Sequence, residues 1–166
     1  MGARTLTKTT DSFLDPTQIG QIDAVLLSHD QHPDNLNRLG RKYVEDSTSV
    51  TLTTSLAASR LSGHCRGLRV WEQTRAGDTT VTAVPAQHGP DGTEHLTGPV
   101  IGFVLESVDG RTVYISGDNA SLAAVEDIAA RFPVVDLGAC LPIGWVDSVM
   151  LGQCRVFSCS RMLSGT

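Results

Sequence analysis

Two histidines and one carboxylate lie close together in the segment Ser28-His-Asp-Gln-His-Pro-Asp-Asn35. These residues, His29, His32 and Asp34, follow an apolar run at positions 22–27 that predicts a β-strand, and they precede a segment with helical spacing. Imidazole nitrogens and carboxylate oxygens at such a strand-to-helix turn can converge on one metal ion of the zinc type. The simpler interpretation is a polar helix start with Asp34 as its N-cap. For Asp34 alone both interpretations stay open, whereas the three residues together favour metal ligands.

Two later segments offer further ligands of the same kind. His88 lies in the loop Pro85-Ala-Gln-His-Gly-Pro90, directly after a segment that alternates apolar and polar residues, and Asp118 follows the segment Tyr114-Ile-Ser-Gly. Each has a simpler explanation, His88 as an ordinary loop histidine and Asp118 as the N-cap of a helix that begins at Ala120. The sequence nevertheless predicts one metal site at the ends of three strands. Its predicted ligands are His29, His32, Asp34, His88 and Asp118.

The elements that must position these residues alternate between strands and helices. Strands are predicted at 22–27, 49–53, 68–72, 79–84, 100–108, 112–116 and 133–137. Helices are predicted at 34–44, 55–61 and 120–131, the first with Leu36, Leu39 and Tyr43 on its apolar face. Asp109-Gly110, between two of the strands, is a strong hairpin signal. Hairpins mixed with strand–helix units predict an α/β layered domain.

In order and in context, the three ligand-bearing segments resemble the first three metal-binding motifs of metallo-β-lactamase-fold hydrolases. The resemblance covers residues 20–137 and is closest to bacterial members whose first motif reads Ser-His-Asp-x-His-x-Asp-Asn. It implies an αββα sandwich with the metal site at one edge. It also implies that a metal-activated water hydrolyses a small-molecule ester, lactone, amide or phosphodiester.

The resemblance also implies a role for each ligand. His32 and His88 fall to a first metal, His29 joins them, Asp34 falls to a second metal, and Asp118 bridges the two. The usual first motif is His-x-His-x-Asp-His, however, so Asn35 stands where a second-metal histidine is usual, and Gln31 is expected to support the ligands by a hydrogen bond. We therefore expect one tightly held metal rather than two, zinc first, with manganese or iron as alternatives. Without a second metal, Asp34 would be the catalytic residue that orients the attacking water or accepts its proton.

The resemblance predicts a partial domain over residues 1–143, followed by an unpatterned tail at 144–166. Core strands usually precede the first motif, yet only 28 residues precede His29, and no histidine follows His95 to serve as the family's last ligand. The chain is therefore expected to be a fragment truncated at both ends. Two alternatives to an active hydrolase stay open. One is a non-catalytic remnant, with or without metal, and the other is an α/β binding domain that never held one.

Composition bounds the partners and the compartment. The 166 residues carry a formal net charge of -5, which argues against a nucleic-acid partner because phosphate binding needs concentrated Lys and Arg. No segment is long and apolar enough to cross a bilayer, and the first residues lack an apolar targeting segment. The four cysteines lack zinc-knuckle spacing and are interpreted as free thiols. We expect a cytoplasmic protein that acts on a small-molecule substrate without nucleic acid or membrane, and the oligomeric state is left open.

Overall fold

The computed structural model describes residues 22–33, 35–47 and 49–140, and in this part of the chain the strands form two sheets. The smaller sheet is parallel, with the order β1-β2-β3, and consists of β1 (Ala24–Leu26), β2 (Val50–Thr54) and β3 (Cys65–Leu68). The larger sheet has the order β4-β5-β6-β7-β8 and consists of β4 (Gln73–Ala76), β5 (Thr79–Pro85), β6 (Ile101–Ser107), β7 (Thr112–Ile115) and β8 (Leu137–Ala139). The described helices are α1 (Arg38–Asp46), α2 (Ser55–Arg60), α3 (Glu94–Thr97) and α4 (Leu122–Arg131).

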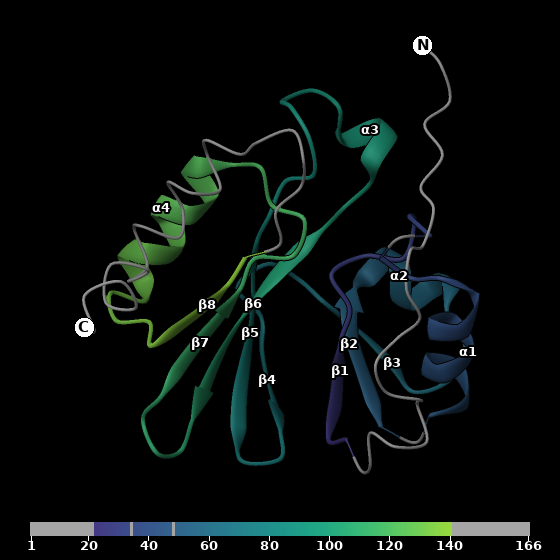
Figure 1. The fold of residues 1–166 in the computed structure, drawn as a ribbon, viewed down its shortest axis with the longest axis horizontal. Coiled ribbons are helices and arrows are strands. Elements are labelled where there is room, and N and C mark those ends of the chain that lie inside the picture. Colours follow the sequence, from purple (N-terminus) through teal and green to yellow (C-terminus); the bar gives the residue numbers. More distant parts are fainter. Residues whose placement is uncertain (1–21, 34, 48, 141–166) are drawn as a thin grey trace, which may run out of the picture.

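Three apolar clusters lie between successive layers of helix and sheet, and Figure 1 shows the order of these layers. Between the sheets, Leu52 of β2 packs in one cluster with Phe103 of β6. On the outer face of the larger sheet, α4 buries Ile128, and on the outer face of the smaller sheet α1 and α2 bury Val44 and Ala57. Burying a large apolar side chain stabilises the fold by about 1.5–3 kcal/mol. Helix, sheet, sheet and helix therefore form successive layers, which confirms the expected αββα sandwich.

Strand directions bring three loops to one edge of this sandwich. Strands β5 and β7 both pair antiparallel with β6, which lies between them, so they run parallel to each other. The loops that follow them therefore leave the sheet on the same side, and they carry His88 and Asp118. The loop after β1 joins them there, because the Ile101 N–H at the start of β6 donates a 3.2 Å hydrogen bond to the Ser28 carbonyl.

The first predicted helix begins later than expected. The sequence predicts a helix at 34–44, but α1 begins at Arg38, and the side chain of Asn37 caps it by accepting a 2.8 Å hydrogen bond from the first turn. The helical spacing misleads because Leu39 is 74% exposed, whereas Val44 is the residue that α1 buries. A polar cap thus overrides the apolar pattern in setting the start of the helix.

Two predicted strands are wrong in position. The segment 68–72 alternates apolar and polar residues, but the chain turns there, with Trp71 at a left-handed φ of 69°, and the turn separates β3 from β4. The segment 133–137 is a loop up to Asp136, whose backbone and side chain bind the start of β7, and β8 only then begins. Helix α3 is too short for any periodicity to predict it. The other predicted elements are confirmed to within a few residues.

Candidate metal centre

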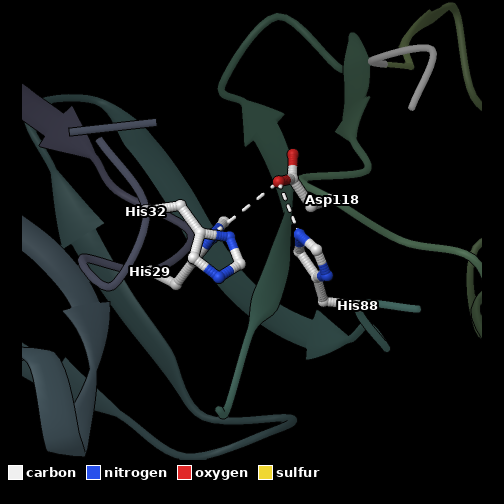
Figure 2. A group of neighbouring side chains, drawn as sticks. All are labelled: His29, His32, His88 and Asp118. Atoms are coloured by element: carbon white, nitrogen blue, oxygen red, sulfur yellow. Dashed lines mark ion pairs between the residues drawn. The ribbon is translucent and has the colours of Figure 1, made fainter. Parts of the chain in front are cut away.

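Three imidazoles and one carboxylate converge at the sheet edge (Figure 2). His29 and His32 come from the loop after β1, His88 from the loop after β5, and Asp118 from the loop after β7. Each offers one ligand atom such that all four atoms lie within 4.8 Å of one another. The Asp118 Oδ2 atom is 3.2 Å from Nε2 of His88 and 3.6 Å from Nε2 of His29. The structure thus brings together four of the five predicted ligands, and Asp34 lies outside the described residues.

The donor set of this cluster fits a divalent cation. The centroids of the three rings lie 4.7 to 5.4 Å apart. A neutral imidazole ring nitrogen offers a lone pair to a cation, and the carboxylate beside the rings offers an oxygen. The buried Nδ1 of His88 has no hydrogen-bond partner within the described residues. Imidazole nitrogens with a carboxylate oxygen are ligands that zinc prefers in proteins.

His29 is fixed by its near neighbours. Its ring is fully buried, and its Nδ1 atom lies 3.0 Å from the Ser28 hydroxyl. The amide of Asn35 donates to the backbone carbonyl of His29 and lies 3.4 Å from the same ring nitrogen. A hydrogen bond to one nitrogen of a metal-binding histidine commonly sets the orientation of the other, and here the other nitrogen, Nε2, faces Asp118. Asn35 therefore supports His29.

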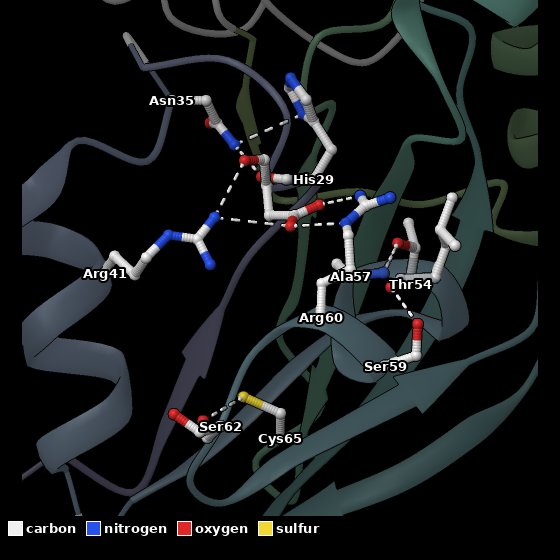
Figure 3. Close-up of polar contacts among 11 residues, drawn as sticks. His29, Asn35, Arg41, Thr54, Ala57, Ser59, Arg60, Ser62 and Cys65 are labelled. Atoms are coloured by element: carbon white, nitrogen blue, oxygen red, sulfur yellow. Dashed lines mark hydrogen bonds and ion pairs between the residues drawn. The ribbon is translucent and has the colours of Figure 1, made fainter.

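Asp30, the next residue, contacts two arginines, Arg41 and Arg60, which are labelled in Figure 3. Arg60 donates from Nε to Oδ2 at 2.9 Å and from a terminal nitrogen to Oδ1, while a terminal nitrogen of Arg41 lies 3.6 Å from Oδ2. The hydrogen bonds from Arg60 hold the pKa of the Asp30 carboxyl below its usual value, against the opposing effect of burial. Counting back from Asp34, position 30 is where the usual motif has its first histidine. In this structure His29, rather than the residue at position 30, faces the other ligands of the cluster.

Gly117 lets the loop after β7 approach the loop after β1. Its φ is +57°, a left-handed conformation that glycine adopts at little cost. A Cβ atom at this position would lie 2.8 Å from the Ile101 carbonyl oxygen and 2.9 Å from the Ser28 Cβ. The close approach that carries Asp118 toward His29 thus depends on the missing side chain.

Asn119 joins the loops after β5 and β7. Its buried side-chain oxygen accepts hydrogen bonds from the N–H groups of Gln87 and Ser121, both at 3.0 Å. The Ala120 N–H adds a backbone link between the same loops, because it donates a 2.7 Å hydrogen bond to the Gln87 carbonyl. The N-cap of α4 is Ser121, which accepts from the helix at 3.2 Å, so the alternative role of Asp118 as a helix cap is wrong.

Other residues of the sequence prediction lie outside the cluster. His64 and His95 are exposed. Gln31 was expected to support the ligands, but its side chain lies against Gly98, where a Cβ would approach its Cδ to 2.9 Å, and its buried Oε1 has no hydrogen-bond partner within the described residues. Ser28 and Asn35 take the supporting position instead.

The supporting residues Ser28, Asp30, Arg60 and Asn119 were missed from the sequence. Asp30 lies inside the first motif, and its position between ligands was a signal that could have been used. Arg60 and Asn119 had no such signal, because their contacts join segments far apart in the chain.

Among the described helices, none has the length and apolar character that crossing a membrane requires.

Sequence comparisons find a family and several relatives. A family model described as "Beta-lactamase superfamily domain" matches residues 5–158. A metal-dependent hydrolase of Pelotomaculum thermopropionicum is 29% identical over 150 residues, which cover 86% of this chain and 63% of the relative. A metal-dependent hydrolase of Anaeromyxobacter dehalogenans is 29% identical over 136 residues, which cover 72% of this chain and 48% of the relative. The chain thus spans from about half to under two thirds of the length of these relatives.

Solved structures share the fold. A candidate metal-dependent hydrolase from Parabacteroides distasonis matches with a TM-score of 0.67 at 23% identity, over 87% of this chain and 65% of that chain. An isothiocyanate hydrolase from Delia radicum gut bacteria matches with a TM-score of 0.63 at 21% identity, over 80% of this chain and 55% of that chain. At these identities the likeness establishes the architecture, while the chemistry must be argued from the residues of this chain.

Proposed function

The chain belongs to the metallo-β-lactamase-fold hydrolase superfamily, and from this membership we propose that it is a metal-dependent hydrolase of a small molecule. The observation that carries the proposal is the convergence of His29, His32, His88 and Asp118 at one edge of the sandwich. The metal-dependent hydrolases among its relatives support the same reaction class. The net charge of -5 favours a small-molecule substrate over a nucleic acid.

The residues of the cluster divide the work between binding and proton transfer. The three imidazoles would hold the cation through ring nitrogens, and Asp118 would offset part of its charge. A divalent cation bound there would act as a Lewis acid toward the substrate oxygen and lower the pKa of a coordinated water. Asp34 is the proposed catalytic residue on sequence grounds, because a carboxylate beside the ligands can orient the attacking water or accept its proton. The substrate would be an ester, lactone, amide or phosphodiester.

We further propose that the site holds one metal and that this metal is zinc, with manganese or iron as alternatives. Zinc is the first expectation for a set of imidazoles and carboxylate. A second metal would need a further ligand at Asn35, but the amide of that residue donates to the backbone of His29. The side chain is therefore already engaged.

Metal analysis combined with hydrolysis assays tests the proposal. We expect about one equivalent of metal per full chain and turnover of generic aryl esters or phosphodiesters that a chelator removes. His32→Ala and His88→Ala should abolish both metal binding and turnover. His64→Ala, which removes an exposed histidine outside the cluster, is the matched control and should change neither. Two firmly bound equivalents, or turnover that survives the chelator, would contradict the proposal.

A non-catalytic metal-binding protein is the second candidate, and one observation favours it. The described cluster offers four protein ligands, and structural zinc sites are closed by four ligands whereas catalytic sites keep one position open. If Asp118 and all three imidazoles bind the same ion, little room stays for a water. Tight metal binding by the full chain without turnover on any substrate class above would support this candidate.

A further inference from the structure

We propose that Asp30, held by Arg60 and Arg41, is a positioning residue that sets how tightly the loop after β1 holds its cation. This inference rests on the proposed metal-dependent function, because it assigns a role toward the metal. It goes further in naming a residue outside the ligand cluster. The geometry that supports it is that the neighbouring side chains of His29 and Asp30 contact different partners.

His29 and Asp30 are consecutive, and their side chains have different partners. The ring of His29 meets Asp118, while the Asp30 carboxylate meets Arg60. Consecutive residues share one rigid peptide plane. Holding Asp30 in place therefore restricts where the backbone of His29, from which the ring extends, can lie.

The arginines tie this loop to two helices. Arg60, which is labelled in Figure 3, is the last residue of α2 and donates two hydrogen bonds to the Asp30 carboxylate. Arg41 lies on α1, and its guanidinium approaches both the carboxylate, at 3.6 Å, and the Asp30 backbone carbonyl, at 3.5 Å. A bidentate arginine–carboxylate pair fixes geometry as well as charge. The loop that carries His29 and His32 is thus anchored to α1 and α2.

Because Asp30 is buried, the loop depends on its contacts with the two arginines. The Asp30 side chain is only 2% exposed, whereas those of Arg41 and Arg60 are 36% and 38% exposed. A buried carboxylate without its partner is costly, so the loop can keep Asp30 inside only while the arginines hold it. On the other side of the loop, the Ser28 carbonyl is bound by the Ile101 N–H. Between these two attachments the His29 ring has little freedom to leave the cluster.

Cobalt titration of the full chain tests the role of Asp30. Co²⁺ is the probe, its dissociation constant is measured by competition with a chromophoric chelator, and the visible spectrum reports the geometry around the ion. Asp30→Asn should weaken Co²⁺ binding by about 10–100-fold, the range for losing a partner that orients a ligand, and it should shift the visible bands. Asp30→Glu should restore part of the affinity. Arg60→Gln should act in the same direction, and Asp30→Asn combined with Arg60→Gln should cost less than the sum of the two.

A matched pair elsewhere provides the control. Asp109 and Arg111 form an exposed ion pair in the hairpin between β6 and β7, at the opposite end of β6 from the site. Asp109→Asn removes the same kind of charge and should leave Co²⁺ affinity within about twofold. A role in stability alone would lower the melting temperature of metal-free Asp30→Asn while leaving affinity and spectrum unchanged.

The outcomes separate this inference from the proposed function. If Asp30→Asn, or Arg60→Gln where the first variant does not fold, binds Co²⁺ with unchanged affinity and spectrum while His32→Ala loses binding, the positioning role is wrong and the metal site stands. If His32→Ala also binds as the unsubstituted chain does, or if the unsubstituted chain binds no Co²⁺, both proposals are overturned.

Discussion

The Nε2 atom of His88 and the Oδ2 atom of Asp118 lie 3.2 Å apart, although their loops follow different strands. The contact exists because β5 and β7 run in the same direction and because Asn119 ties the two loops together. The carboxylate is thereby placed where it can neutralise a cation held by the imidazoles. Its charge is then the property to test.

Asp118→Asn should weaken metal binding without unfolding the chain. The substitution keeps the size of the side chain but removes the negative charge that would offset the cation. We expect a loss of affinity at least as large as the roughly 10–100-fold typical of losing a partner outside the ligand set. Isothermal titration with Zn²⁺ measures it, and Asp109→Asn serves as the control. Unchanged affinity would show that Asp118 does not face the ion.

Metal loading should raise the stability of the chain, and a chelator should reverse the change. A ligand that binds only the folded state stabilises it by about 2.7 kcal/mol when present at 100 times its dissociation constant. We expect the melting temperature to rise with Zn²⁺ concentration in the unsubstituted chain and in His64→Ala. In His88→Ala it should not rise. A rise of equal size in all three proteins would point to binding away from the cluster.

The site could be predicted from the sequence mainly where ligand type and local context agree. His29, His32, His88 and Asp118 each follow a predicted strand, and parallel directions of β5 and β7 bring such positions to one edge. The direction of each side chain could not be predicted from the sequence. Whether His29 or position 30 faces the cluster depends on Arg60, whose contact with the loop is a tertiary one.

For the fold as for the site, some features could be predicted from the sequence and others could not. Layers could be predicted because hairpins occur together with strand–helix units in the sequence, and in the structure β5 and β6 each bury consecutive residues and hence both faces. Turns were harder. The alternation across 68–72 predicted a strand, and only the left-handed conformation of Trp71 reveals the turn. That conformation is uncommon for a residue with a side chain, so no composition rule indicates it.

Asn119→Ala should destabilise the chain and weaken the metal site together. The substitution removes the side-chain acceptor of the Gln87 and Ser121 N–H groups, which are part-buried, and a donor left unsatisfied costs about 1–3 kcal/mol when it is fully buried. We expect a loss of about 2–4 kcal/mol in urea unfolding and weaker Zn²⁺ binding. Asn37→Ala, which removes the cap of α1, should cost about 1 kcal/mol and leave Zn²⁺ affinity unchanged.

Gly117→Ala should cost more stability than Gly110→Ala and should also weaken metal binding. Both glycines have a positive φ, so alanine is strained at either position by about 1–3 kcal/mol. At Gly110 a Cβ would meet nothing within 4 Å, whereas at Gly117 it would meet the Ile101 carbonyl oxygen at 2.8 Å and the Ser28 Cβ at 2.9 Å. Relieving that overlap requires the loops after β1 and β7 to separate, at a further cost of about 1–3 kcal/mol.

Separation of these loops would move Asp118 away from His29, whose contact at 3.6 Å spans them. Urea unfolding of the metal-free proteins measures the difference in stability, and Zn²⁺ titration at a temperature where both variants are folded measures the effect on the site. Gly110→Ala isolates the effect of backbone strain, because a Cβ atom at that position would meet nothing within 4 Å. The close approach at Gly117 would be shown to be unimportant if the two variants lost equal stability and kept equal Zn²⁺ affinity.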